Sequence, residues 1–192
     1  MTGPIVVTGF GPFGSFADNP SSAILEPLSK AGIPGFKEKL IVEKISVEYD
    51  KVIAAVEEIW KKNPVMVVHV GAHPCPGIIK LEQQSFRNGY CRYDVRGCVP
   101  PYNVCCPCGD DTLVTSIDCT AIAEKVNKVH GSENLTIEKS DDPGRYLCAF
   151  SYYLSLQKGK ALFIHVPAFD EHTTVEKVVE VVRDVISECV KC

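Results

Sequence analysis

The chain has 192 residues, of which 45% are hydrophobic and 23% charged, and its formal net charge is −4. This composition is too apolar and too weakly charged for a disordered chain, and the length suits one domain spanning 1–192. The acidic pI of about 5.7 argues against a nucleic-acid surface, and no apolar run reaches the roughly 18 residues of a membrane span, so we expect neither nucleic acid nor a membrane as a partner.

The N-terminal sequence and the cysteine content predict the cellular compartment of the protein. Met1 to Pro4 offer no basic region and no long apolar run follows, so we expect no signal peptide and a cytoplasmic location. The ten cysteines are about 5% of the chain, below the roughly 8–10% of a disulfide scaffold. In a reducing compartment they are expected to be free thiols, of which one or more is reactive or metal-binding.

Short apolar runs alternate with amphipathic segments along the chain. The first run, 4–9, predicts a strand that leads into a glycine- and proline-rich turn at 9–14. Asn19 followed by Pro20 then predicts the start of a helix. Strands are predicted at 4–9, 39–47, 65–71, 78–82, 134–138 and 161–166, and helices at 20–28, 48–62, 117–129, 145–157 and 174–190.

This alternation predicts an α/β fold, a three-layer α/β/α sandwich with a mostly parallel twisted sheet and helices on both faces. The uninterrupted apolar runs at 65–71 and 161–166 predict strands buried on both faces. Between 83 and 111 the periodicity vanishes, and the segment has three prolines, three glycines and five cysteines. We expect a long structureless loop there, which in a compact domain is usually functional or mobile.

Chemistry is expected where the carboxyl ends of the strands meet helix starts. The run Ser140-Asp141-Asp142-Pro143-Gly144 predicts a helix with Asp142 as N-cap and Pro143 at its first position. Cys148 then lies one to two turns from that start, where the helix dipole stabilises a thiolate and free N–H groups receive an oxyanion. The alternative is that Cys148 simply packs as a small buried hydrophobe.

Residues that could act together with such a thiol are found at the ends of other predicted strands. His165 ends an apolar strand and suits a general base, and His69 and His73 compete for that role from another strand end. Glu82 suits a carboxylate that orients an imidazole, or else is a solvated charge at a strand end. Phe10 and Phe13 flank Gly11-Pro12 and suit the walls of an apolar pocket, or else fold into the core. Local pattern alone leaves these alternatives open.

Four motifs together resemble those of the pyroglutamyl peptidase I (pyrrolidone-carboxylate peptidase) family. They are 8–14 followed by Asn19-Pro20-Ser21, the pair of segments 68–71 and Leu81-Glu82, the cysteine motif 140–148, and the histidine motif 163–167. Their order and spacing run through the whole chain. The loop from Tyr90 to Cys108, with its Cys105-Cys106 pair, is more similar to the animal branch than to the bacterial one.

The resemblance implies a cysteine peptidase that removes N-terminal pyroglutamate (5-oxoproline) from peptides through a thioester, without a metal or cofactor. It implies Cys148 as nucleophile, His165 as general base and acid, and Glu82 as the residue that orients His165. Phe10 and Phe13 would sandwich the flat lactam ring, which carries no free amine. The family includes both monomers and tetramers, so the resemblance allows a monomer.

Two alternatives to an active peptidase remain from the sequence. Family positions are altered at Pro143, Ala149, Arg87 and the loop 72–76, which suggests a related protein with weak or lost activity that binds pyroglutamyl ends. The cysteines between Cys91 and Cys108 suggest zinc, since thiolates suit that metal. However, their spacing does not provide two C-x2-C knuckles, and the pair Cys189 and Cys192 lies far from them in the sequence.

Overall fold

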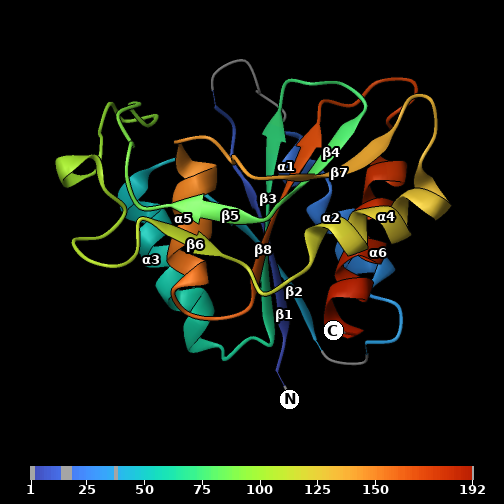
Figure 1. Ribbon diagram of the computed structural model, residues 1–192, viewed down its shortest axis with the longest axis horizontal. Coiled ribbons are helices and arrows are strands. Elements are labelled where there is room, and N and C mark those ends of the chain that lie inside the picture. The colour runs from blue at the N-terminus through green and yellow to red at the C-terminus, as the bar shows by residue number, and fades with distance from the viewer. Residues whose placement is uncertain (1–2, 14–18, 37–38, 192) are drawn as a thin grey trace.

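A six-stranded sheet forms the middle layer of the protein in the computed structural model, which describes residues 3–13, 19–36 and 39–191 (Figure 1). The strand order is β2-β1-β3-β8-β4-β7. The strands are β1 (Ile5–Phe10), β2 (Leu40–Ile45), β3 (Met66–His73), β4 (Ile78–Glu82), β7 (Thr136–Ser140) and β8 (Ala161–Pro167). The first four in spatial order are mutually parallel, whereas β4 is antiparallel to β8 and carries β7 parallel to itself.

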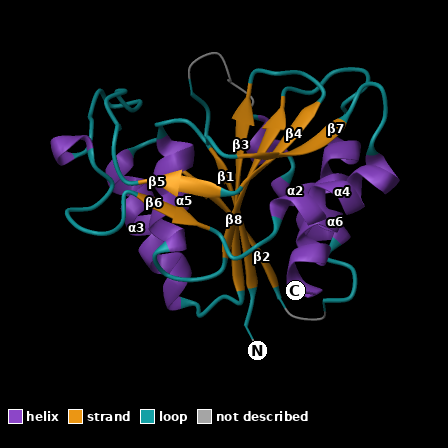
Figure 2. Cartoon of the chain, in the orientation of Figure 1, coloured by secondary structure: helices purple, strands orange, loops and turns teal. Residues whose placement is uncertain are grey.

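Helices cover both faces of this sheet, as Figure 2 shows. One face packs against α1 (Pro20–Ala23), α2 (Leu25–Ala31), α4 (Cys119–His130) and α6 (Val175–Lys191), and the other against α3 (Tyr49–Lys61) and α5 (Leu147–Leu156). The apolar stripe of α3, for instance, buries Val52, Val56 and Ile59. The predicted three-layer α/β/α sandwich with a mostly parallel sheet is thereby confirmed.

The apolar strands are buried on both faces, which explains why their sequences do not alternate. Along β8, Phe163 points into the core beside α3 and α5, whereas Leu162 and Ile164 point into the core beside α4 and α6. Every residue of β1 and β8 is buried. Within the described part of the chain, no helix is long and apolar enough to cross a membrane.

The start of α5 differs from its prediction, because Asp142 and Pro143 do not open the helix. The Asp142 carboxylate instead accepts hydrogen bonds from the Gly144 N–H at 3.0 Å and the Arg145 guanidinium at 2.8 Å, and Gly144 has a φ of +79°. This local turn competes with helix formation. The N-cap is Tyr146, in an extended conformation, so Cys148 lies in the first turn of α5.

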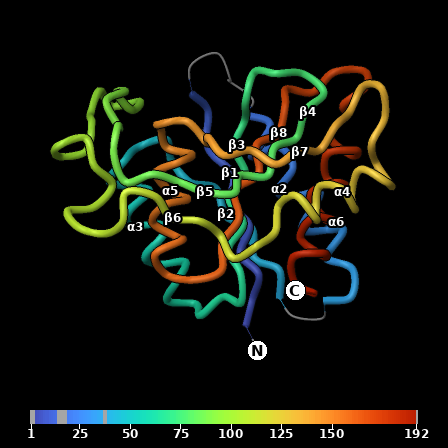
Figure 3. The backbone as a smooth tube through the Cα atoms, in the orientation of Figure 1, coloured from blue at the N-terminus to red at the C-terminus, as the bar shows by residue number. Residues whose placement is uncertain are grey.

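Three other predictions are corrected. The segment 83–111 is not structureless: β5 (Gln84–Phe86) pairs antiparallel with β6 (Thr112–Val114), a 3-10 turn spans Pro101–Asn103, and the segment crosses α5 (Figure 3). The helix predicted at 20–28 is two helices that meet at Ile24. The predicted turn at 9–14 begins later, because Gly9 and Phe10 belong to β1, and Gly14, like Met1, Thr2 and Cys192, lies outside the described residues.

Candidate active site

His165 and Glu82 meet on the sheet face that packs against α5. In the antiparallel register, Lys80 lies opposite His165 and Glu82 lies opposite Phe163. Glu82 is therefore level with a residue two positions before His165 on β8, further inside the sheet. The His165 Nδ1 lies 2.8 Å from Glu82 Oε1. Glu82 is completely buried and His165 is 7% exposed, so Glu82 is not a solvated charge at a strand end.

Cys148 reaches this pair from the N-terminus of α5. Its half-buried thiol interacts with His165 through a hydrogen bond and a charge that raise the pKa of the ring. The first N–H to bond within the helix is that of Phe150, to the Tyr146 carbonyl. The N–H groups of 147–149 therefore have no helical acceptor in the described structure, and Tyr146 supplies no side-chain cap. Such an end favours an anion.

The electrostatics of His165 reflect its two partners. Burial by itself lowers the pKa of this imidazole, but the hydrogen bonds and charges of Cys148 and Glu82 raise it, and the pKa is about 9. At neutral pH the ring is therefore protonated, and it lies between the Glu82 carboxyl group and the Cys148 side chain. The three side chains come from β4, α5 and β8, and only the tertiary structure brings them together.

Gly71 on β3 makes room for the thiol. A Cβ atom at this position would lie 2.9 Å from the Cys148 Sγ and 2.7 Å from the Phe163 ring. Both distances are shorter than side-chain contacts allow, and both neighbours belong to a packed site. A glycine is therefore required here because the Cys148 sulfur and the Phe163 ring lie too close for any side chain, and not because of its backbone conformation.

We expect Gly71→Ala to lower kcat/KM by about 10- to 100-fold, because misplacing a reacting atom by about 1 Å can cost as much as 100-fold. The measurement is the steady-state hydrolysis rate, together with the melting temperature of the variant. Gly35→Ala, outside the site, is a control for lost stability, because its φ of +74° strains an alanine there, and it should lower the melting temperature without changing kcat/KM. A Gly71→Ala enzyme with unchanged kcat/KM would contradict the described position of the thiol.

The other two candidate histidines have structural contacts. His69 is fully buried between the Thr8 and Ser155 hydroxyls, at 2.6 and 2.7 Å, and burial lowers its pKa to about 3. His73 donates from Nε2 to the Ile78 carbonyl at 2.7 Å and accepts the Cys75 N–H at Nδ1, and burial lowers its pKa. Both rings are neutral at pH 7 and engaged through both nitrogens.

An apolar pocket lies beside the thiol. It is lined by Phe10, Phe13, Val47, Ala72, Tyr146 and Leu147, with Cys148 at one side. Phe10 is buried and stacked on Phe163 with ring centres 6.4 Å apart, whereas the half-buried Phe13 lies 6.2 Å from the Tyr146 ring. Both predicted phenylalanines thus line the pocket. The sequence analysis missed Tyr146, whose position two residues before Cys148 was the available signal.

Asn19 and Ser21 hold the Phe10 wall in place. The Ser21 hydroxyl accepts the Phe10 N–H at 2.9 Å, and the Asn19 amide donates to the Gly11 carbonyl at 2.9 Å. The Asn19 side-chain oxygen in turn accepts from the Ser21 N–H and hydroxyl. The predicted helix cap therefore also fixes the backbone of the pocket, a role that no local sequence signal indicates.

The segment 91–98 fixes the Tyr146 wall from outside. The buried Asp94 carboxylate accepts the N–H groups of Tyr49, Arg96 and Cys98. The Tyr146 hydroxyl donates to the Tyr93 carbonyl at 3.2 Å, and the Arg92 guanidinium stacks 4.4 Å from the centre of the Tyr146 ring. The cysteine-rich loop is thus part of the structure around the pocket.

The loop cysteines do not form a shared site. Cys91, Cys98 and Cys108 are exposed, whereas Cys105 is buried with its thiol 3.5 Å from the Phe150 carbonyl, and burial raises its pKa. Across 3–13, 19–36 and 39–191, no three His, Cys, Asp or Glu side chains are arranged to hold a metal ion. The zinc alternative therefore gains no support from the described geometry.

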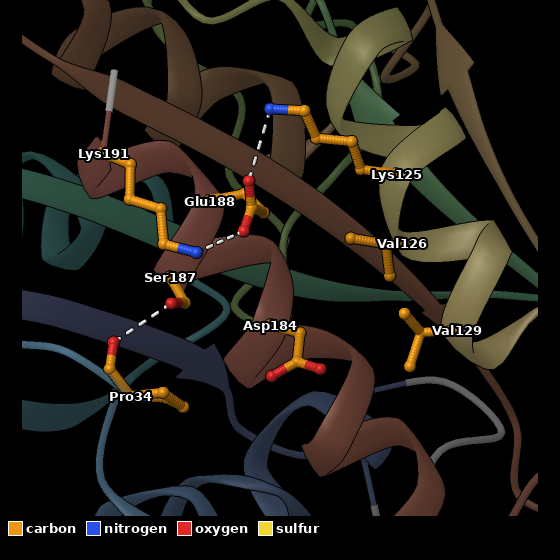
Figure 4. Close-up of a pocket in the computed structure, with 8 residues that line it drawn as sticks. All are labelled: Pro34, Lys125, Val126, Val129, Asp184, Ser187, Glu188 and Lys191. Carbon is orange, nitrogen blue, oxygen red and sulfur yellow. Dashed lines mark hydrogen bonds and ion pairs between the residues drawn. The ribbon is translucent and has the colours of Figure 1, made fainter.

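A second groove lies on the opposite face of the sheet, between α4 and α6 (Figure 4). Its charges are already paired: Glu188 bridges Lys125, at 3.4 Å, and Lys191, and the Ser187 hydroxyl donates to the Pro34 carbonyl at 3.0 Å. No cysteine or histidine lines it. The smaller pocket beside Cys148 is therefore the candidate active site.

A thiol at a helix start, an imidazole beside it and a carboxylate behind the ring form the arrangement of cysteine hydrolases. The family model described as "Putative pyroglutamyl peptidase PgaPase_1" matches residues 1–170. The chain is 35% identical to pyroglutamyl-peptidase 1 of Rattus norvegicus and 34% identical to that of Homo sapiens, in each case over 96% of this chain and 88% of the relative. The chain belongs to the pyroglutamyl peptidase family, and its animal-type members are among its relatives.

Solved structures agree with this assignment. The pyrrolidone carboxyl peptidase of Thermus thermophilus superposes with a TM-score of 0.84 at 25% identity, over 95% of this chain and 98% of that one. The shared architecture extends over nearly the whole length of both proteins.

Proposed function

We propose that this protein is a cysteine peptidase that removes N-terminal pyroglutamate from peptides, with Cys148 as nucleophile and His165 as general base and acid. Glu82 acts through His165 as a positioning residue. The observation that carries the proposal is the buried chain of contacts from Glu82 through His165 to the Cys148 thiol, at the opening of an apolar pocket.

The reaction uses the thiolate–imidazolium pair. The Cys148 thiolate attacks the carbonyl carbon that joins pyroglutamate to the second residue and forms a C–S bond. The N–H groups at the start of α5 stabilise the resulting oxyanion. His165 then gives its proton to the departing amine as the C–N bond breaks, which leaves a thioester. Neutral His165 next removes a proton from water, the resulting hydroxide attacks the thioester, and pyroglutamate and the Cys148 thiolate are released.

The pocket suits a flat, uncharged lactam ring. Phe10, Phe13 and Tyr146 supply aromatic walls, and no charged side chain lines the pocket. An aminopeptidase site needs a carboxylate for the free amine of its substrate, but pyroglutamate has no such amine. We propose that Phe10 and Phe13 contact the two faces of the ring.

The altered positions lie away from the pocket, with one exception. The Ala149 side chain packs into the core beside α5, and Arg87 pairs with Asp111 at 2.8 Å across the β5–β6 hairpin. Pro143 is buried ahead of the helix and removes no helical N–H. Only Ala72, from the altered loop 72–76, lines the pocket. This placement favours an active enzyme over a binding protein.

We expect purified protein to hydrolyse a pyroglutamyl amide and to leave the matching prolyl amide uncleaved, because proline carries a charged amine that the apolar pocket cannot pair. The measurement is release of the amine leaving group, with free 5-oxoproline as a competitive inhibitor. Binding of 5-oxoproline by calorimetry without any turnover would support the non-catalytic alternative. Equal hydrolysis of both amides would contradict the proposed ring recognition.

A further inference from the structure

Three basic side chains each neighbour a residue of the candidate active site. Arg92 comes from the cysteine-rich loop, Lys80 from β4 and Lys44 from β2, and we call these three residues the basic rim. None of the three forms an ion pair with any described residue, although the chain as a whole has a net charge of −4. Unpaired cations from three separate elements therefore lie beside residues of one site in an acidic protein.

Each member of the basic rim is tied to a residue of the site. The Arg92 guanidinium lies 4.4 Å from the centre of the ring of Tyr146, a pocket wall two residues from Cys148. Lys80 is half-buried directly opposite His165 in the β4–β8 register, where neighbouring Cβ atoms are about 5 Å apart. The Lys44 side chain lies against Gly11, with its Cε 3.8 Å from a Cβ built there.

The nearby carboxylates do not neutralise this rim. Glu43, beside Lys44, pairs with Lys62 at 2.6 Å, and Glu48 pairs with Arg96. The Asp94 carboxylate accepts hydrogen bonds from three backbone N–H groups. Glu138 lies opposite Lys80 in the β4–β7 register but forms no ion pair with it in the described structure, so the charges of the rim residues remain unpaired.

On the proposed function, a bound substrate carries its next residues past this rim. The lactam ring enters the pocket, and His165 protonates the nitrogen of the second residue, which therefore leaves beside Lys80. Each extended residue spans about 3.3–3.6 Å, so the second and third side chains come within reach of Lys80 and Arg92. We propose that the basic rim selects pyroglutamyl peptides with an acidic side chain at the second or third position.

The test compares pyroglutamyl-glutamyl peptides with pyroglutamyl-glutaminyl peptides of otherwise identical sequence, which differ in charge and hardly in shape. At low ionic strength we expect kcat/KM to be about two- to fivefold higher for the acidic peptide, the range of one exposed ion pair. Salt at about 0.5 M should bring the ratio close to one, because it screens exposed charges.

Variants separate charge from packing. Lys80→Gln combined with Arg92→Gln should bring the ratio close to one, whereas Arg92→Lys keeps the charge and should retain the preference. Lys128→Gln on the far face of α4 removes the same charge and should leave the ratio unchanged. A ratio of one or less at low salt, with both peptides hydrolysed, overturns this inference and leaves the proposed function intact. A preference that persists in the double variant also overturns it, and hydrolysis of neither peptide overturns both proposals.

Discussion

Cys148→Ser is expected to lower kcat/KM on a pyroglutamyl amide by at least about 10⁴-fold. A serine hydroxyl at this position titrates far above the physiological range, so the His165 imidazolium no longer faces an anionic nucleophile. The side chain keeps nearly the same shape and fits the space left by Gly71, so the fold is retained. The measurement is the rate of amine release, with circular dichroism to check folding.

Cys91→Ser is the matched control. Cys91 is exposed on the loop outside the pocket, and the same atom exchange there should leave kcat/KM within about twofold, as for most surface substitutions. Residual Cys148→Ser activity within tenfold of the wild type would contradict Cys148 as the nucleophile. A comparable loss in Cys91→Ser would instead assign the chemistry to the loop.

The second large effect is expected from Glu82→Gln, which should lower kcat by about 10²- to 10⁴-fold. The Glu82 carboxylate is buried and contacts His165 Nδ1 at 2.8 Å, and its charge and hydrogen bond raise the pKa of His165. A neutral amide holds the ring less firmly and stabilises the imidazolium less, so the reactive ion pair becomes scarcer.

The same substitution should move the pH profile of activity. In the wild type we expect activity to require protonated His165 and to fall as the pH rises through its pKa of about 9. Glu82→Gln should shift this alkaline limb to lower pH, because it removes a group that raises the pKa. The measurement is kcat/KM from pH 6 to pH 10, and Glu124→Gln on α4 is the charge-matched control. An unchanged alkaline limb would exclude Glu82 as the residue that holds His165.

The free energy of unfolding should also decrease as the pH rises and His165 loses its proton. The folded pKa of His165 is about 9, above the usual value of about 6.5 for an unfolded chain. The stabilisation from this group is therefore complete below about pH 6.5 and is lost as the pH rises to about 9. Glu82→Gln should reduce this pH dependence of the free energy of unfolding.

Local sequence signals predicted the helices and strands well where neighbouring residues determine them, as at a helix cap. Asn19, which was predicted to begin a helix, caps α1 with its side chain. The predicted start of α5 was wrong because Asp142, Gly144 and Arg145 form a turn of their own. The segment 83–111 was predicted to lack structure because β5 and β6 are only three residues each and are separated by a long loop.

The sequence by itself determined the α/β class, the order of the elements and the motifs that carry Glu82, Cys148 and His165, because apolar runs, helix caps and motif residues are readable over a few neighbours. The tertiary structure decided which residues meet. It turned β4 antiparallel to β8, so that Glu82 is buried beneath His165, and it engaged His69 and His73 elsewhere. It also brought Tyr146 and the cysteine-rich loop to the pocket. Such contacts join residues far apart in the chain, and only strand register and packing determine them.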